Sequence, residues 1–202
     1  MKLVWKGKFK GIEDLPIVEL PDNAVMFEEP ETGAEIARRI TNFLVPIVIF
    51  LLLVVLIRRK VNGYFTLLNV LNPWGVILIP FSLLPHEFLH AVVFPKYAKV
   101  EMWYSIKEMI ALVTSTTAIS KGRFVFLNLL PNIVFGFLPL IVWIFIPNNM
   151  YFIGGLLFTF AFISLIMGVG DFMNVYNTIK QVPKDAMIQV SGFNSYWFCK
   201  EK

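Results

Sequence analysis

Long uncharged stretches dominate the pattern of this 202-residue chain. Residues 40–57, 61–85 and 124–170 contain no Asp, Glu, Lys or Arg. A membrane-spanning helix needs about 20 predominantly apolar residues. The first stretch is long enough for one helix, the second for one that continues past its end, and the third for two with a break at residues 147–149. The pattern therefore predicts four membrane helices, at about 40–57, 74–95, 124–146 and 150–175.

Shorter alternating patterns outside these stretches favour β-strands. Residues 3–9 alternate in part, and residues 18–27 read as a strand interrupted by Pro21. Residues 100–106 and 111–120 are rich in Val, Ile, Thr and aromatic side chains, which predicts a hairpin in the loop after the second helix. Two roles stay open for this hairpin: a plain cap on the membrane domain, or an edge that receives an extended peptide as an added strand.

The N-terminal segment contains a helix-start signal and a stretch that is similar to one near the C-terminus. Thr32 and Glu35 have the spacing of a capping box, which predicts that the first helix starts there. Pro46 then falls in the first turns of the predicted span, where proline is tolerated. Residues 21–26 resemble residues 183–188, each a proline turn followed by apolar residues. We expect these two segments to pair in a small sheet.

These patterns together predict the fold class and the order of its parts. We expect an all-α membrane protein with about four transmembrane helices, a small strand-rich cytoplasmic loop and terminal strands. Its parts are an N-terminal cytoplasmic segment at 1–37, a membrane domain at 38–178 and a C-terminal cytoplasmic tail at 179–202.

Composition supports the membrane class. Hydrophobic residues make up 57% of the chain, charged residues 16%, and the mean hydropathy is +0.69. Soluble domains contain about 25% charged residues. The single cysteine, Cys199, excludes an intrachain disulfide. The chain is therefore expected to have the lipid bilayer as its main environment.

The net charge of +4 does not indicate nucleic-acid binding, because the basic residues lie beside the apolar stretches, where they set topology. The loop between the second and third helices holds Lys96, Lys99, Lys107, Lys121 and Arg123. This places that loop and both termini in the cytoplasm of a multi-pass cell-membrane protein. Residues 58–60, Arg-Arg-Lys, oppose this topology, and a hairpin or re-entrant segment within residues 61–85 is the alternative.

A metal-binding motif lies at the end of the second uncharged stretch. The sequence His86-Glu87-Phe88-Leu89-His90 contains both histidines of the chain. On a helix, residues four apart share a face, so the two imidazoles can hold one Zn²⁺ ion, with Glu87 placed to take a proton from a water that the metal activates. The alternative is a structural hydrogen-bond network between helices.

The remaining polar residues of the membrane helices supply further candidates. Asp171 follows 47 uncharged residues, and we expect it to be the third metal ligand. The alternative for Asp171 is a helix-end carboxylate at the membrane interface, in which case Glu101, Glu108 or a second chain would supply the third ligand. Asn128 and Asn132 are four apart on one helix face. With Asn174, they are candidates to hold a substrate or an oxyanion, and helix packing is the alternative.

On these residues the chain resembles integral-membrane zincins: the site-2-type intramembrane metalloproteases and, more closely, a bacterial family described as putative zincin peptidases. The resemblance spans most of residues 74–175. It rests on His-Glu-Phe-Leu-His in an early helix, the strand-rich loop after it, and Gly170-Asp171 in a late helix. In the site-2-type enzymes, the motif that contains the third metal ligand resembles Asn-Pro-Asp-Gly, whereas this chain has Gly-Asp-Phe-Met-Asn. The resemblance implies peptidase activity.

The sequence hypothesis is a zinc metallopeptidase that hydrolyses peptide bonds in membrane or membrane-proximal protein segments. His86, His90 and Asp171 would hold Zn²⁺, and Glu87 would act as the general base. One alternative is a non-catalytic metal-binding protein or a scaffold or accessory membrane protein. Another is a structural membrane protein whose His-Glu-His trio only forms hydrogen bonds.

Overall fold

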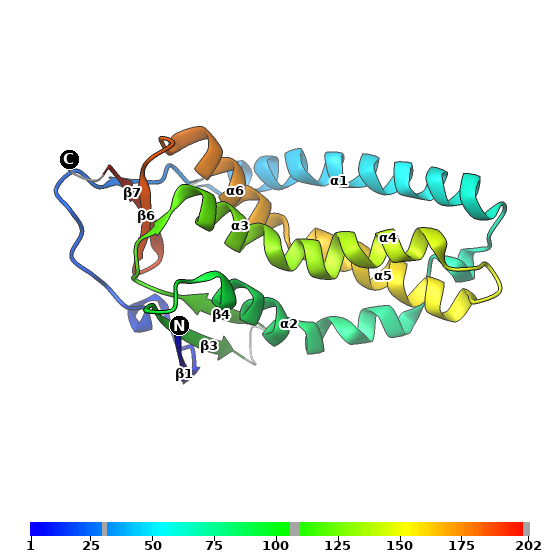
Figure 1. Ribbon diagram of the computed structural model, residues 1–202, viewed down its shortest axis with the longest axis horizontal. Coiled ribbons are helices and arrows are strands. Elements are labelled where there is room, and N and C mark those ends of the chain that lie inside the picture. The colour runs from blue at the N-terminus through cyan, green and yellow to red at the C-terminus, as the bar shows by residue number, and fades with distance from the viewer. Residues whose placement is uncertain (30–31, 106–109, 200–202) are drawn as a thin grey trace. The chain divides into compact units, whose positions relative to one another are not determined.

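The computed structural model describes residues 1–29, 32–105 and 110–199 (Figure 1). The chain forms two compact units that alternate along the sequence. The sheet unit comprises Met1–Pro30, Leu83–Leu130 and Asn174–Lys202, and the helical unit comprises Glu31–Ser82 and Pro131–Met173. Three helices begin in one unit and end in the other: α2 (Pro73–Val93), α3 (Lys121–Asn132) and α6 (Val169–Gln181).

The sheet unit contains two small sheets. In the first, β1 (Lys2–Lys8) runs parallel to β3 (Lys99–Ser105), which pairs antiparallel with β4 (Ile110–Thr114). The second has the order β2-β7-β6-β5 and is antiparallel throughout. Its strands are β2 (Val25–Met26), β5 (Ile119–Ser120), β6 (Met187–Ser191) and β7 (Asn194–Phe198), and a short 3₁₀ turn, η1 (Ile12–Asp14), follows β1.

The predicted hairpin is present, but its second strand is shorter than expected. Residues 111–120 do not form one strand, since residues 115–118 between β4 and β5 are not in a strand. The Ser115 hydroxyl donates to the carbonyl of Lys99 at 2.6 Å and accepts from the N–H of Thr117 at 3.2 Å. Such local side-chain bonds compete with the strand ladder. As a result, β5 joins the other sheet.

Two expectations for the N-terminal segment were wrong in detail. Of residues 18–27, only β2 is a strand, because a turn closed by a bond from Ala24 N–H to the Pro21 carbonyl precedes it. The two similar segments, residues 21–26 and 183–188, do not pair with each other. Val25 and Ile188 both face Trp197, so β7 lies between β2 and β6 in one sheet.

The helical unit is built on a long first helix, α1 (Gly33–Asn62). Thr32 caps it as predicted, since its hydroxyl accepts from the N–H of Glu35 at 3.3 Å. The helix begins earlier than residue 40, so Pro46 lies in its interior and not in its first turns. Gly63 ends the helix with φ 74°, a conformation that favours glycine.

The rest of this unit packs around Trp143. The 3₁₀ turn η2 (Leu67–Asn69) precedes α2. After α3 come a π-helical turn, η3 (Ile133–Phe137), then α4 (Leu138–Phe145) and α5 (Tyr151–Met167). Trp143 is fully buried among side chains of α1, α4 and α5. Three asparagines tie residues 62–72 to the α4–α5 hairpin through bonds to main-chain carbonyls: Asn62 to Ile144, Asn69 to Asn148 and Asn72 to Phe152.

Arg58, the first residue of the charge cluster at 58–60, is buried. Its guanidinium donates to the Trp143 carbonyl and to the Asn148 side chain, and it lies 4.3 Å from the centre of the Trp143 ring. The residue is 0% exposed. An arginine held in this way has a packing role, so its position need not report the topology of the chain.

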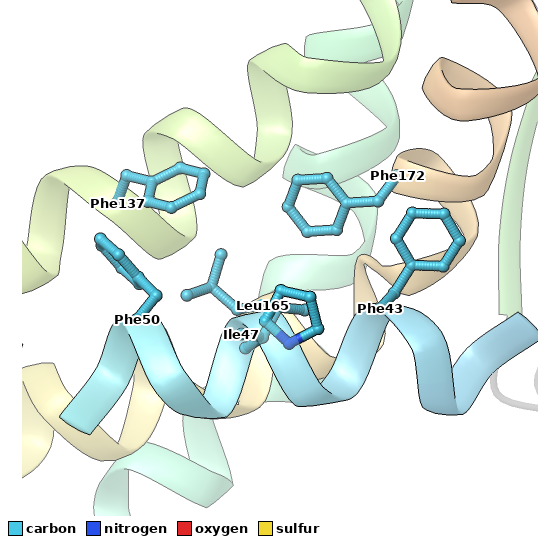
Figure 2. A pocket seen from close by; sticks show the side chains of 7 residues that line it. Phe43, Ile47, Phe50, Phe137, Leu165 and Phe172 are labelled. Atoms are coloured by element: carbon cyan, nitrogen blue, oxygen red, sulfur yellow. The ribbon is translucent and has the colours of Figure 1, made fainter. Parts of the chain in front are cut away.

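An apolar pocket of about 300 Å³ lies within the helical unit (Figure 2). Phe137 from the π-helical turn and Phe172 from α6 line it together with one face of α1. The other lining residues are Phe43, Pro46, Ile47, Phe50 and Leu165. Because all of these side chains are apolar, the pocket offers no group for proton transfer or metal binding.

Among the described residues, three helical stretches are long and apolar enough to cross a membrane: Ala37–Asn62, Leu67–Val93 and Lys121–Phe145. The fourth predicted span is broken. α5 and α6 form an apolar pair bent by 47°, which makes a fourth crossing if the pair counts as one span. The helices are therefore compatible with a multi-pass membrane protein.

Candidate metal centre

The last turns of α2 bring His86, Glu87 and His90 together within the sheet unit. Each residue offers one potential ligand atom, and these atoms lie within 4.8 Å of one another. The two imidazole ring centres are 5.0 Å apart. Because Zn–N bonds are about 2.0–2.1 Å long, two ligand atoms on one ion are at most about 4.2 Å apart, so small side-chain rotations suffice. The three residues fit a single metal ion in spacing and in donor type.

His90 is held in place from outside the motif. It is 8% exposed, and its Nδ1 lies 2.9 Å from the main-chain carbonyl oxygen of Leu127 in α3. A carbonyl oxygen only accepts, so Nδ1 carries the proton in this hydrogen bond. The Nε2 atom then keeps its lone pair, which is the arrangement a metal-binding imidazole needs.

Glu87 is also held by a main-chain group. The N–H of Val113 in β4 donates to Oε2 of Glu87 at 3.0 Å. Figure 1 shows β4 beside the C-terminal part of α2, consistent with this bond. The strand-rich loop after the motif therefore contacts the motif itself and fixes the direction of its carboxylate.

Two acidic residues of the loop were alternatives for a third ligand. Glu101 is buried and forms ion pairs with Lys99 at 2.7 Å and Lys6 at 3.3 Å, and it is not part of the group around the histidines. Both lysines compete with a metal ion for this carboxylate, so the ion pairs favour Asp171 over Glu101, and the ligand role of Glu101 stays an untested alternative. Glu108 lies outside the described residues.

Asp171, the preferred third ligand, belongs to the helical unit. Its Oδ2 accepts from the side-chain amide of Asn132 at 2.8 Å. Gly168 makes room for Asn132, since a Cβ atom at Gly168 would meet the Asn132 side chain. The ligand role of Asp171 stays a prediction, while the geometry around it shows that its carboxylate has a polar partner on α3.

The other two asparagine candidates contact each other. The Asn174 amide donates to Oδ1 of Asn128 at 2.9 Å, and the Asn128 amide donates to the Phe124 carbonyl at 2.8 Å. Both residues lie in the sheet unit, where they join α3 to α6. Packing contacts thus exist for Asn128, Asn132 and Asn174, and a role in binding substrate stays a prediction.

Sequence reasoning missed the contributions of Val113 and Leu127. Both act through the main chain, which every residue type provides, so neither side chain gives a signal. The contacts also join positions 26 and 37 residues apart along the chain.

A protein-family model described as "Putative zincin peptidase" matches residues 79–187, which is more than half of the chain. The match begins within α2 before the motif, includes the sheet strands β3, β4 and β5, and ends at the start of β6. No curated protein and no solved structure matches the chain significantly.

Proposed function

Because this chain belongs to the Putative zincin peptidase family, we propose that it is a membrane-embedded zinc metallopeptidase. The observation that carries the proposal is the convergence of His86, Glu87 and His90 within 4.8 Å on one helix. In the part of the chain that the structure describes, three helices apolar enough to span a bilayer, or four with the bent pair, support the membrane placement. With the bent pair counted as a fourth span, we propose that both termini and the loop at residues 96–123 lie on the cytoplasmic side.

The proposed ligands are His86 and His90 with Asp171 as the third. When bound, Zn²⁺ supplies Lewis-acid polarisation of the scissile carbonyl and lowers the pKa of water toward about 7. The main-chain carbonyl of Leu127 keeps the Nε2 lone pair of His90 available for binding. Two histidines and a carboxylate that leave an open position suit zinc hydrolysis.

Glu87 is the proposed general base. Its carboxylate takes the proton of the attacking water and later passes it to the leaving amine. The Val113 N–H holds one carboxylate oxygen, Oε2, which restricts the side chain to one orientation. A base that is already oriented loses less entropy on reaching the transition state.

The substrate is proposed to bind as an extended segment along the outer edge of β4. The Val113 N–H bonds to Glu87, so it points away from β3. Val113 and its β3 partner Met102 therefore form a non-hydrogen-bonded pair of the antiparallel ladder. Ala111, two residues away, faces the same edge. The Val113 N–H already bonds to Glu87, so an added strand would pair with the main chain of Ala111 and lie beside the general base. Membrane and membrane-proximal protein segments are the proposed substrates.

The test combines metal content with detection of cleavage. Detergent-purified wild-type protein should contain about one zinc per chain. His86→Ala should lose the zinc and Glu87→Gln should keep it. Membranes that contain the wild type should gain new protein N-termini, identified by mass spectrometry, that are absent with Glu87→Gln.

Each other outcome favours a different protein class. Zinc without any new N-termini would make this a non-catalytic metal-binding or accessory protein. Wild-type protein without zinc, even after reconstitution, would reduce the motif to a hydrogen-bond network.

A further inference from the structure

The carbonyl that holds His90 has an unusual place in its own helix. In an α-helix the carbonyl of residue 127 accepts from the N–H of residue 131. Residue 131 is a proline inside α3. Proline has no N–H, and its ring crowds the carbonyl four residues before it. The Leu127 carbonyl therefore lacks its regular helical donor for a reason written in the sequence.

His90 uses this carbonyl. Its Nδ1 lies 2.9 Å from the Leu127 oxygen, and the contact is buried. The Pro131 side chain is itself fully buried. A buried carbonyl needs a donor, and the imidazole N–H supplies one. The histidine and the helix thereby satisfy each other's hydrogen-bonding needs.

The turn that presents the carbonyl is fixed on its other side. Asn128, the next residue, donates to the Phe124 carbonyl at 2.8 Å and accepts from Asn174 of α6 at 2.9 Å. Leu127 itself is buried in a hydrophobic cluster with Phe124 and Ile188. The acceptor for His90 is thus a rigid group on a packed helix.

We propose that Pro131 is a positioning residue of the metal site: by removing the helical donor, it dedicates the Leu127 carbonyl to His90 and fixes this imidazole as the Nδ1–H tautomer. The metal part of this inference rests on the proposed function, whereas the tautomer is a property of the metal-free protein. The inference explains why a helix-disrupting residue sits four positions after the carbonyl that the motif uses.

Restoring the missing donor should change how His90 is held. In Pro131→Ala, the new N–H bonds to the Leu127 carbonyl and draws it back toward the helix axis. His90 then loses its exclusive acceptor and populates both tautomers. Loss of such an outer partner weakens metal binding by about 10-fold to 100-fold, so we expect the zinc dissociation constant to rise by about 10-fold.

The experiment is NMR of the full chain in detergent, with ¹⁵N-labelled histidine and without metal. Only two imidazoles contribute signals, and His86→Ala leaves that of His90 alone. The wild type should show His90 protonated at Nδ1, and Pro131→Ala should show a mixture. Zinc affinity is measured on the same samples by competition with a chelator. Pro46→Ala makes the same chemical change inside α1 and should alter neither readout.

The results test the tautomer of His90 and the binding of zinc separately. A wild-type His90 protonated at Nε2 would overturn the inference, even if Pro131→Ala failed to fold. An unchanged tautomer and unchanged zinc affinity in a folded Pro131→Ala would also overturn it. A wild-type Nδ1–H tautomer in a protein that binds no zinc would support the positioning and refute the proposed function.

Discussion

The N–H of Val113 and the carboxylate of Glu87 form a 3.0 Å hydrogen bond between an edge strand and the motif helix. The strand is the last in its sheet, and the bond uses the N–H that faces away from β3. A single main-chain group therefore connects the strand-rich loop to the proposed general base. If Glu87 is the general base, this connection lets the loop orient it.

Replacing Val113 by proline should remove this bond and spare the sheet. Proline lacks the N–H but is tolerated on an edge strand where that group faces outward. We expect cleavage to fall by up to about 100-fold, since small misplacement of a catalytic group has costs of this size. Zinc content should not change. Val113→Ala keeps the N–H, so its activity should stay near that of the wild type; equal loss in both variants would argue against the orienting role.

Replacing Asp171 by alanine tests the third ligand. If Asp171 binds the metal with His86 and His90, the zinc dissociation constant should rise by at least about 10-fold, because a catalytic zinc site uses three protein ligands. The measurement is chelator competition in detergent. Asp185→Ala removes another acidic residue from the C-terminal part of the chain and should leave the affinity unchanged. Wild-type affinity in Asp171→Ala would mean that another group completes the site.

Two glycines near the α5–α6 break provide a matched pair. A Cβ atom at Gly168 would lie 2.7 Å from Cγ of Asn132, whereas one at Gly170 would meet nothing within 4 Å. Gly168→Ala should therefore displace Asn132, disturb its bond to Asp171 and destabilise the protein by about 1–3 kcal/mol. Gly170→Ala should be nearly neutral. Unfolding by denaturant in detergent compares the two, and equal stability would contradict the predicted close contact.

Arg58 and Arg59 are adjacent but should differ in their importance. Arg58 is buried with charge-assisted bonds to the Trp143 carbonyl and to Asn148, whereas Arg59 is exposed and contacts Tyr64. Arg58→Met should cost about 2–3 kcal/mol, because bonds to charged groups are worth about 1.5–3 kcal/mol and a carbonyl loses its donor. Arg59→Met should cost less than about 0.5 kcal/mol. Similar midpoints of denaturant unfolding for the two variants would show that Arg58 is not a structural residue.

Local sequence determined the helices and the core of the site. The length of the uncharged stretches predicted the long apolar helices. A segment that buries its main chain among apolar groups has to satisfy its own hydrogen bonds, and a helix does so. The spacing of His86 and His90 placed both imidazoles on one face, because α-helical geometry depends only on the positions along the chain. Thr32 set the start of α1 for a similarly local reason, since its hydroxyl needs only an N–H three residues later.

The tertiary structure alone decided which main-chain groups meet these side chains. Val113 and Leu127 contact Glu87 and His90 across 26 and 37 residues, and no side-chain type marks a main-chain donor or acceptor. The same holds for β7, which separates the two similar segments at 21–26 and 183–188 because strand order depends on packing. The role of Pro131 depends on both the sequence and the tertiary structure. Its missing N–H is written in the sequence, but only the fold brings His90 to the carbonyl that this proline leaves without a helical donor.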